Sequence, residues 1–278
     1  MINKAKAAGK LINGIAYLSP SRAGKITLDL FCRPIEGREF NKKEMTFLKK
    51  AKWSSLKLDG KKIQCYTWGT EGQKVLLAHG FNSNASRWRP LVNLLQKSGY
   101  QVIALDIPAH GHSDGRRING LLYARVIEQV MQQFQPSFVI GHSFAGIAFA
   151  YYFSIMKALT VEKIILLGVP NELSDIADVF FQQVGLNEKV QAAYYRTFEE
   201  KFGYPTTFFT LSKLLKEVPY PSLIIHDEND DIASFAGAKQ IHELWEGSTF
   251  FPTKNLGHSL QGRSVYKAIL EFLKQKNG

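Results

Sequence analysis

The 278-residue sequence has only two cysteines, Cys32 and Cys65, and they show no metal-ligand spacing. Two cysteines cannot make a disulfide framework, and nothing in their usage requires an oxidising compartment. Apolar runs are short, and none reaches the ~18 residues of a membrane-spanning helix. The sequence also lacks internal repeats and low-complexity segments. With 45% hydrophobic and 12% aromatic residues, it predicts a folded globular protein with a sizeable core.

Acidic residues are scarce at the start of the chain. Residues 1–52 hold twelve Lys and Arg against four Asp and Glu, whereas the remaining 226 residues hold 23 against 20. The net charge of +11 therefore belongs mainly to a basic N-terminal extension. Because no nucleic-acid-binding motif accompanies this charge, we expect a solvated basic face and no nucleic-acid partner. Peripheral contact between residues 1–52 and an anionic membrane is the alternative.

The first twenty residues combine basic side chains with a short apolar stretch from Leu11 to Leu18, which Asn13 and Gly14 interrupt. No clean small-x-small cleavage site follows a solid hydrophobic block, so the pattern favours a short helix packed on the body over an export signal. An interfacial amphipathic helix is the second interpretation. We therefore expect a cytoplasmic protein, with export or peripheral membrane association as the alternatives.

From residue 53 onward, apolar runs of strand length alternate with stretches of helical spacing. An Asp59-Gly60 pair joins the first two runs in a β-hairpin. The expected strands are Trp53–Leu58, Lys61–Trp68, Lys74–His79, Gln101–Asp106, Ser137–His142, Glu162–Leu167, Pro221–His226 and Ser248–Phe251. The expected helices are Ser86–Ser98, Leu121–Phe134, Phe144–Met156, Phe235–Trp245 and Ser264–Lys274. This order predicts an α/β fold, a mostly parallel central sheet with helices on both faces.

One segment interrupts the alternation. Residues 171–216 lie between two expected strands, carry no strong strand pattern and hold nine aromatic residues. Ligands of parallel sheets bind beyond the carboxyl ends of the strands, where this insertion emerges. We interpret 171–216 as a helical lid over an apolar pocket, and residues 53–170 and 217–278 as the core. Residues 1–52 are expected to pack on that body as an extension.

Ser143 is the candidate nucleophile. The expected strand Ser137–His142 leads into the sequence Gly-His-Ser-Phe-Ala-Gly at 141–146. A serine in a tight turn between a buried strand and a helix fits the nucleophile elbow, which needs small residues two positions before and after the serine, here Gly141 and Ala145. Ala145 stands in the last place of this G-x-S-x-G pattern, and Gly146 follows it. The helix start also supplies positive potential where an oxyanion forms.

A serine nucleophile needs a base, and a histidine oriented by an acid is the expected partner. Six of the seven histidines are better understood from their local positions, at strand ends, in an upstream loop or within a helix: His79, His142, His226, His110, His112 and His242. His258 lies in the loop between the last expected strand and the last helix. It is therefore the candidate base, in the chain order Ser…Asp…His.

The acid is expected just after a strand that lies between these two residues. The sequence HDENDD at 226–231 follows such a strand, and Asp230 has the most plausible reach to the histidine. Asp231 and Asp227 are competitors, and Glu172, after the preceding strand, is a more remote one. The other carboxylates of this run are expected to be solvated.

An oxyanion hole requires two backbone N–H donors that are fixed in advance. One candidate is the N–H of Phe144, directly after the nucleophile. The other is the N–H of Phe81, in the loop after the strand Lys74–His79, where Gly80 lets the backbone approach a ligand closely.

Five segments together resemble the α/β-hydrolase superfamily, in its serine-nucleophile branch of esterases and lipases. They are HGFNSNASRW (79–88), DIPAHGHSDG (106–115), GHSFAG (141–146), HDENDD (226–231) and LGHS (256–259). The resemblance runs from about residue 53 to the end of the chain. It implies the α/β-hydrolase fold, a Ser143–Asp230–His258 triad, and an oxyanion hole from Phe81 and Phe144. It implies neither a metal nor an organic cofactor.

Two positions depart from the pattern of this superfamily, because Ala109 and Ala145 stand where glycine is frequent. Because both residues are small, we expect them to affect the reaction rate more than the roles of the site residues. The spacing His110-x-His112-x-Asp114 also matches the start of a metal-binding motif of metallo-β-lactamase-like hydrolases. Gly115 stands where the next histidine ligand belongs, and no later His/Cys pair completes a site. We expect these histidines to form hydrogen bonds within their loop.

The superfamily's fold hosts several reactions, and serine at position 143 argues against those that use a carboxylate nucleophile, as in dehalogenases and epoxide hydrolases. The aromatic insertion and the near-neutral body favour an apolar acyl or ester substrate. We expect a small-molecule carboxylic ester, or a lactone, thioester or monoacylglycerol, to be hydrolysed through an acyl-enzyme on Ser143. A C–C bond hydrolase with the same triad and a non-catalytic ligand-binding protein are the alternatives.

Overall fold

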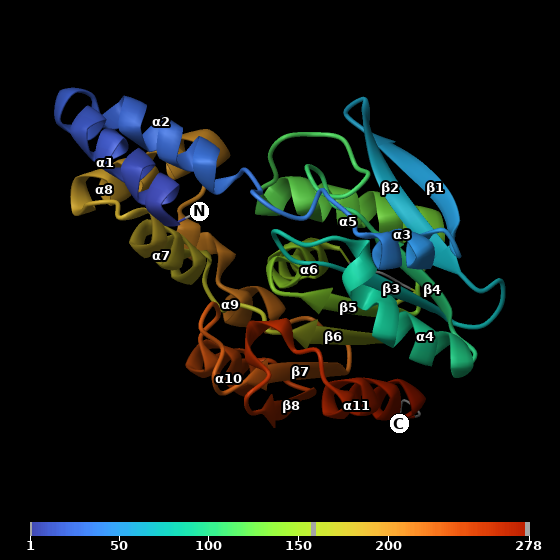
Figure 1. The fold of residues 1–278 in the computed structure, drawn as a ribbon. Coiled ribbons are helices and arrows are strands. Elements are labelled where there is room, and N and C mark those ends of the chain that lie inside the picture. Colours follow the sequence, from blue (N-terminus) through green and yellow to red (C-terminus); the bar gives the residue numbers. More distant parts are fainter. Residues whose placement is uncertain (1, 157–159, 276–278) are drawn as a thin grey trace.

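The computed structural model describes residues 2–156 and 160–275 and is built around one eight-stranded sheet (Figure 1). The strands are β1 (Lys52–Leu58), β2 (Lys61–Trp68), β3 (Lys74–Ala78), β4 (Gln101–Leu105), β5 (Phe138–His142), β6 (Lys163–Leu167), β7 (Ser222–Asp227) and β8 (Ser248–Thr253). Their order across the sheet is β1-β2-β4-β3-β5-β6-β7-β8. β1 and β2 form the predicted hairpin, β2 pairs antiparallel with β4, and the remaining pairs are parallel.

Helices cover both faces of the sheet, as the strand–helix alternation predicts. Successive residues of β3 point to opposite faces, so Leu76 joins one hydrophobic core while Val75 and Leu77 join the other. The first core is closed by helices α5 (Gly120–Phe134), α6 (Phe144–Ile155) and α10 (Phe235–Leu244). The second is closed by helices α3 (Lys42–Leu48), α4 (Arg89–Lys97) and α11 (Arg263–Lys274). The predicted α/β architecture is confirmed.

The predicted helix Ser86–Ser98 differs in its first turn. The structure divides this segment into a 3-10 turn, η1 (Ala85–Trp88), and helix α4. Pro90 lies in the first turn of α4. Proline has no N–H and fits an α-helix only at its start, so the α-helix begins at Arg89.

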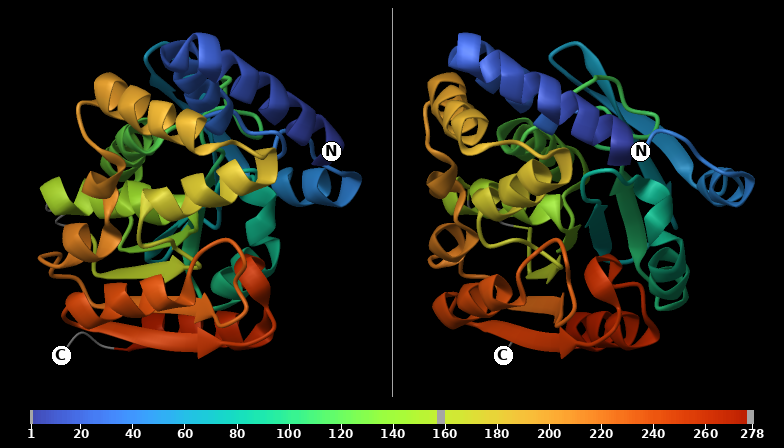
Figure 2. Two further views of the ribbon diagram at one scale, coloured as in Figure 1. Left: turned by 90° about the vertical axis from the view of Figure 1, so that its left-hand side faces the viewer. Right: turned by 60° about the vertical axis from the view of Figure 1, so that its left-hand side comes forward.

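The insertion and the N-terminal helices together form a helical lobe beyond the carboxyl ends of the parallel strands (Figures 1 and 2). The insertion contains α7 (Leu173–Val184), α8 (Glu188–Phe202), the turn η2 (Thr206–Phe209) and α9 (Leu211–Leu215). The N-terminal helices are α1 (Ile2–Leu18) and α2 (Pro20–Phe31). α2 packs on α8, and α1 packs on α2 and α7. Residues 1–52 thus contact the insertion through α1 and α2, and the sheet body through α3.

Two glycines allow the helices of the lobe to approach closely. A Cβ at Gly9 of α1 would collide with the carbonyl oxygen of Val184, and one at Gly24 of α2 with the carbonyl oxygen of Ala193. The buried side chains Ile12 and Ala16 complete the inner side of α1. Within the described ranges, no helix has the length and apolar character needed to cross a membrane.

Candidate active site

Ser143 occupies a sharp turn between β5 and α6, as the strand–turn–helix pattern predicts. Its backbone angles, φ 53° and ψ −117°, lie in a region that residues with a Cβ rarely adopt. Only small neighbours fit beside this turn. A Cβ at Gly141 would press on the ring of Phe149, and a Cβ at Gly146 would collide with Val169. The turn holds the Ser143 side chain above the end of the sheet.

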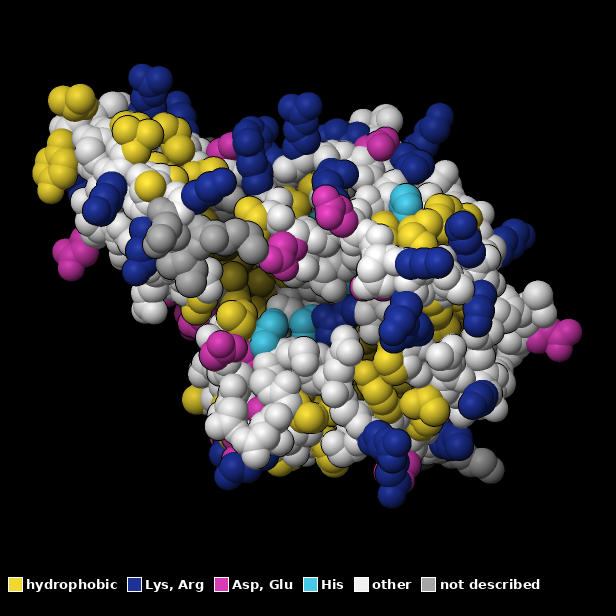
Figure 3. Space-filling view, viewed as in Figure 1, with side chains coloured by type: hydrophobic (Ala, Val, Ile, Leu, Met, Phe, Trp, Pro, Cys, Tyr) yellow, Lys and Arg dark blue, Asp and Glu magenta, His cyan; other side chains and the backbone are white. Residues whose placement is uncertain are grey.

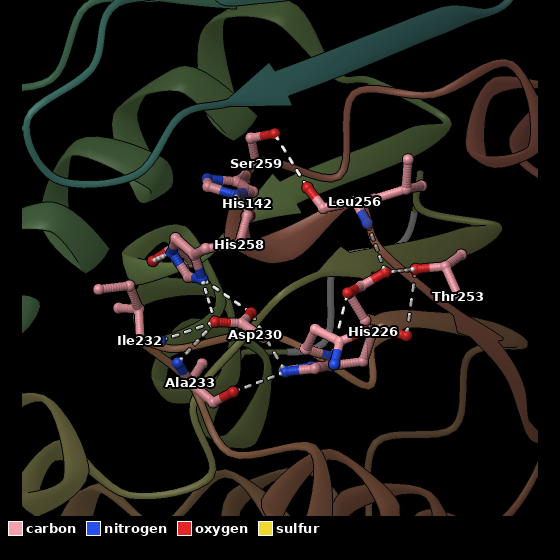
Figure 4. Close-up of polar contacts among 12 residues, drawn as sticks. His142, His226, Asp230, Ile232, Ala233, Thr253, Leu256, His258 and Ser259 are labelled. Atoms are coloured by element: carbon pink, nitrogen blue, oxygen red, sulfur yellow. Dashed lines mark hydrogen bonds and ion pairs between the residues drawn. The ribbon is translucent and has the colours of Figure 1, made fainter.

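The three side chains proposed from the sequence meet at this point. The Oγ atom of Ser143 lies 2.9 Å from Nε2 of His258. Nδ1 of His258 lies 2.8 and 3.0 Å from the two carboxylate oxygens of Asp230 (Figure 4). Because Nδ1 donates its proton to the carboxylate, Nε2 is the nitrogen that can accept a proton from the serine hydroxyl. Residues separated by more than a hundred positions thus form one hydrogen-bonded chain.

The carboxylate of Asp230 is fully buried and firmly oriented. It accepts hydrogen bonds of 2.9 Å from the backbone N–H groups of Ile232 and Ala233, and Nε2 of His226 lies 3.3 Å away. Burial alone raises the pKa of Asp230, but hydrogen bonds from His226, His258 and the backbone outweigh burial and hold it well below its ordinary value of 3.8. Asp230 therefore remains an anion beside His258 at neutral pH.

The competing acids make other contacts. Asp227 accepts hydrogen bonds from Thr253 Oγ1 at 2.8 Å and from the backbone N–H of Leu256 at 3.0 Å, so it ties β7 to the loop that carries the histidine. Asp231 is exposed at the surface. Glu172 accepts a hydrogen bond from Ser174 at 3.0 Å. Asp230 is the carboxylate that the structure places on His258.

The two proposed oxyanion donors lie beside the serine. Phe144 is the first residue of α6, so its N–H has no partner within the helix. Phe81 follows Gly80 in the loop after β3, and both phenylalanines line the same cavity as Ser143. Gly80 is required for this approach, because a Cβ there would lie 2.9 Å from the Cβ of Ser143.

His79 fixes the orientation of the peptide bond that carries the Phe81 N–H. Its Nε2 accepts a hydrogen bond of 3.1 Å from the backbone N–H of Ile107, so Nδ1 carries the proton and donates it to the Gly80 carbonyl at 2.7 Å. A trans peptide directs its C=O and N–H to opposite sides, so this bond turns the Phe81 N–H away from His79. Burial lowers the pKa of His79 well below its ordinary range, which keeps the ring neutral. In the sequence pattern, His79 was recognisable only as the end of a strand.

Arg87 and His142 hold the loop that carries His258. Nη2 of Arg87 donates to the Ser259 carbonyl at 2.9 Å, and Nη1 contacts Nδ1 of His142. The other nitrogen of His142, Nε2, donates to the His258 carbonyl at 2.8 Å (Figure 4). Burial, and then the charge of Arg87, lower the pKa of His142 well below its ordinary range. Neither residue was predicted from the sequence to belong to the site. The one available signal in the sequence was the charged residue Arg87 next to the apolar residue Trp88.

A largely apolar cavity of about 490 Å³ opens above Ser143 and His258. Its walls include Ile176, Val179 and Phe180 from α7, together with Ala5 and Ala8 from α1. Figure 3 shows the corresponding hollow between the helical lobe and the sheet body, where histidine side chains lie against hydrophobic ones. The contribution of the N-terminal helix to this wall was not predicted from the sequence.

The loop with the alternative metal spacing is held by hydrogen bonds. His110 accepts from the Asn82 N–H and contacts the Pro108 carbonyl, His112 contacts the Tyr66 hydroxyl, and Asp114 accepts from a backbone N–H. Among the residues that the structure describes, no group of three or more His, Cys, Asp or Glu side chains is arranged to hold a metal ion.

Comparison with known proteins agrees with this fold. A family model described as the alpha/beta hydrolase fold matches residues 74–187. The AB hydrolase superfamily protein YisY of Bacillus subtilis is 25% identical over 231 residues, which cover 67% of this chain and 85% of that protein. The esterase Rv0045c of Mycobacterium tuberculosis is 27% identical over 128 residues, 44% of this chain and 42% of that protein. The Pyrococcus furiosus esterase Pf2001 has a TM-score of 0.64 at 17% identity, covering 87% of this chain and 96% of that chain.

The chain therefore has the α/β-hydrolase fold, and its resemblance to this superfamily is confirmed. Relatives named as an esterase and as a monoacylglycerol lipase support the assignment of this chain to the hydrolases. The similarity to the solved structures shows the fold alone, because the sequence identities are 20% or lower.

Proposed function

We propose that the protein is a serine hydrolase that cleaves a carboxylic ester, or a related acyl compound, with an apolar acyl group. The observation that carries this proposal is the hydrogen-bonded chain from Ser143 Oγ through His258 to the buried Asp230 carboxylate, at the floor of an apolar cavity. A serine hydroxyl becomes a nucleophile when a base removes its proton, and this arrangement supplies the base and its orienting acid.

The proposed reaction has two stages. In the first, His258 accepts the Ser143 proton as Oγ attacks the acyl carbon, and the N–H groups of Phe81 and Phe144 stabilise the oxyanion. His258 then protonates the leaving alcohol, which leaves an acyl-enzyme on the serine. In the second stage, His258 activates a water molecule that releases the acid and restores the serine. Asp230 keeps the histidine ring oriented and stabilises its charged form throughout.

The cavity suggests the chemical class of the acyl group. Its described walls are mainly aliphatic and aromatic, so burial of an apolar chain there gains free energy of roughly 25 cal/mol per Å² of surface removed from water. An acyl chain extending from Ser143 toward α7 and α1 would contact Ile176, Val179 and Ala8. We therefore propose that esters of longer fatty acids are better substrates than acetate esters.

Labelling with a fluorophosphonate, measured by intact mass, tests the proposal. The folded protein is expected to gain one label, because an activated serine attacks the phosphorus centre. A p-nitrophenyl ester series from acetate to palmitate then measures the chain-length optimum. Absence of labelling in folded protein would contradict the activated serine and favour a ligand-binding protein.

The chain-length optimum is expected to move when the cavity is narrowed. Ile176→Trp places an indole in the cavity wall, so kcat/KM for long-chain esters should fall about tenfold or more relative to acetate. Gln182→Trp is the matched control, because Gln182 lies on the same helix but is exposed and outside the cavity lining. An unchanged optimum for Ile176→Trp would place the acyl group elsewhere.

Arg87 is expected to act as a positioning residue. Arg87→Met removes the hydrogen bonds to Ser259 and His142, so the loop that carries His258 loses its anchor. A displacement of about 1 Å costs on the order of 100-fold in rate, and we expect kcat to fall by this amount with KM nearly unchanged. Arg87→Lys should recover part of the rate, and Arg89→Met, at the exposed start of α4, serves as the control. A change in KM alone would contradict the positioning role.

A further inference from the structure

The most exposed large hydrophobic side chains of the described residues are gathered at the start of the chain. On α1, Leu11, Tyr17 and Leu18 are 68%, 71% and 92% exposed. Ile35, which follows α2 beside the cavity near the start of α1, is 77% exposed. Figure 3 shows hydrophobic side chains at the upper left end of the helical lobe, over α1 and α2. Apolar side chains gathered in this way mark a surface that contacts a partner.

Basic residues surround this apolar surface. Lys4, Lys6 and Lys10 lie on α1, and Arg22 and Lys25 lie on α2, all of them exposed. The single acidic residue of the two helices is Asp29, which forms ion pairs with Arg33 and Arg117. The positive charge around the exposed leucines is therefore not neutralised within α1 and α2.

The geometry points to a lipid surface as the occupant. Lys4, Leu11 and Leu18 are spaced seven residues apart and share one side of α1, so a cation and two apolar side chains face outward together. We propose that the outer side of α1 docks on an anionic lipid bilayer, with Leu11 and Leu18 inserted among the acyl chains. The lysines would then meet anionic headgroups.

A second copy of the chain fits this surface less well. A symmetric dimer would place the same patch of each subunit against the other, and on α1 and α2 each patch carries five exposed cations against one acidic residue, Asp29. Like charges facing one another across an interface repel, whereas an anionic bilayer attracts them. The positive charge of the surface therefore favours an anionic bilayer over a second copy of the chain as the partner.

The docking surface adjoins the cavity. Ala8 lines the cavity and lies three residues before Leu11 on α1, and Ile35 both lines the cavity and is exposed. Docking would bring the cavity mouth to the bilayer, so the substrate class narrows to apolar esters dissolved in a membrane. This last step rests on the proposed function, whereas docking itself does not.

Vesicle co-sedimentation of the full chain tests the proposal, with vesicles of phosphatidylcholine alone or mixed with phosphatidylglycerol. The protein is expected to bind the anionic vesicles, and more weakly at high salt. Leu11→Ser/Leu18→Ser should weaken binding about tenfold or more. Lys6→Gln/Lys10→Gln should weaken it about fivefold per lysine. The matched controls are Ile155→Ser/Leu244→Ser and Lys57→Gln/Lys97→Gln, which change exposed residues on other elements.

Two further measurements separate the outcomes. Hydrolysis of a soluble short-chain ester should be equal in all these variants, because none of the altered residues lines the cavity. Loss of vesicle binding by the Leu11/Leu18 or Lys6/Lys10 variants, with normal ester hydrolysis, therefore supports docking. Vesicle binding by the unaltered chain without any ester hydrolysis contradicts only the proposed function. Absence of binding to anionic vesicles, or equal binding by the Leu11/Leu18 variant, would overturn the proposal. So would a dimer in sedimentation velocity that this variant dissociates.

Discussion

Ser143→Ala is expected to lower kcat by about 10³- to 10⁶-fold, the range that loss of a triad nucleophile produces in other serine hydrolases. The methyl group keeps the Cβ in place, so the turn between β5 and α6 and the cavity should persist. Only the Oγ atom, which lies 2.9 Å from His258 Nε2, is removed. Steady-state hydrolysis of the best p-nitrophenyl ester measures the loss, and fluorophosphonate labelling should disappear with it.

Ser154→Ala provides the control for this experiment. Ser154 lies on the helix that follows Ser143, but it is exposed and its hydroxyl donates to the backbone carbonyl of Tyr151. Its activity and labelling should match those of the parent protein. Normal turnover by Ser143→Ala would remove the acyl-enzyme scheme entirely.

Asp230→Asn is expected to have the second-largest effect, a loss of about 10⁴-fold in kcat, as for the corresponding change in other triads. Asparagine preserves the shape of the side chain but removes the charge that stabilises the imidazolium. Its amide can also donate to His258 Nδ1, which would leave Nε2 protonated and unable to accept the serine proton. The pH–rate profile and kcat of the purified variant measure this effect.

Two neighbouring carboxylates serve as comparisons. Asp231→Asn changes an exposed side chain and should leave kcat within about twofold. Asp227→Asn weakens the connection between β7 and the histidine loop, so its main effect should be on thermal stability. A larger loss of kcat in Asp231→Asn than in Asp230→Asn would show that the proposed mechanism names the wrong acid.

The sheet could be predicted from the sequence because its strands are short apolar runs with polar or glycine boundaries. Each expected strand begins and ends within two residues of the observed one. Ser143, His258 and Asp230 could also be proposed from the sequence, because each of them follows the end of a strand. Parallel strands bring those ends to one edge of the sheet. The division of the chain into extension, core and lid remains a prediction.

The sequence did not reveal the groups that orient the site. His79 and Arg87 act through backbone carbonyls of Gly80 and Ser259, and a carbonyl has no signature in a residue pattern. The wall formed by α1 was also hidden. Its packing depends on the close approach of Gly9 to the carbonyl of Val184, a contact between segments more than 170 residues apart.

The positive φ of Ser143 implies an opposition between stability and activity. Such a conformation costs a residue with a Cβ roughly 1–3 kcal/mol, whereas glycine adopts positive φ freely. A chain with glycine at this position would fold more favourably but would lack the hydroxyl group that we propose as the nucleophile. With serine there, part of the folding free energy is offset by the strain of holding one hydroxyl group in place. A protein that used this fold only to bind a ligand would gain nothing from that strain.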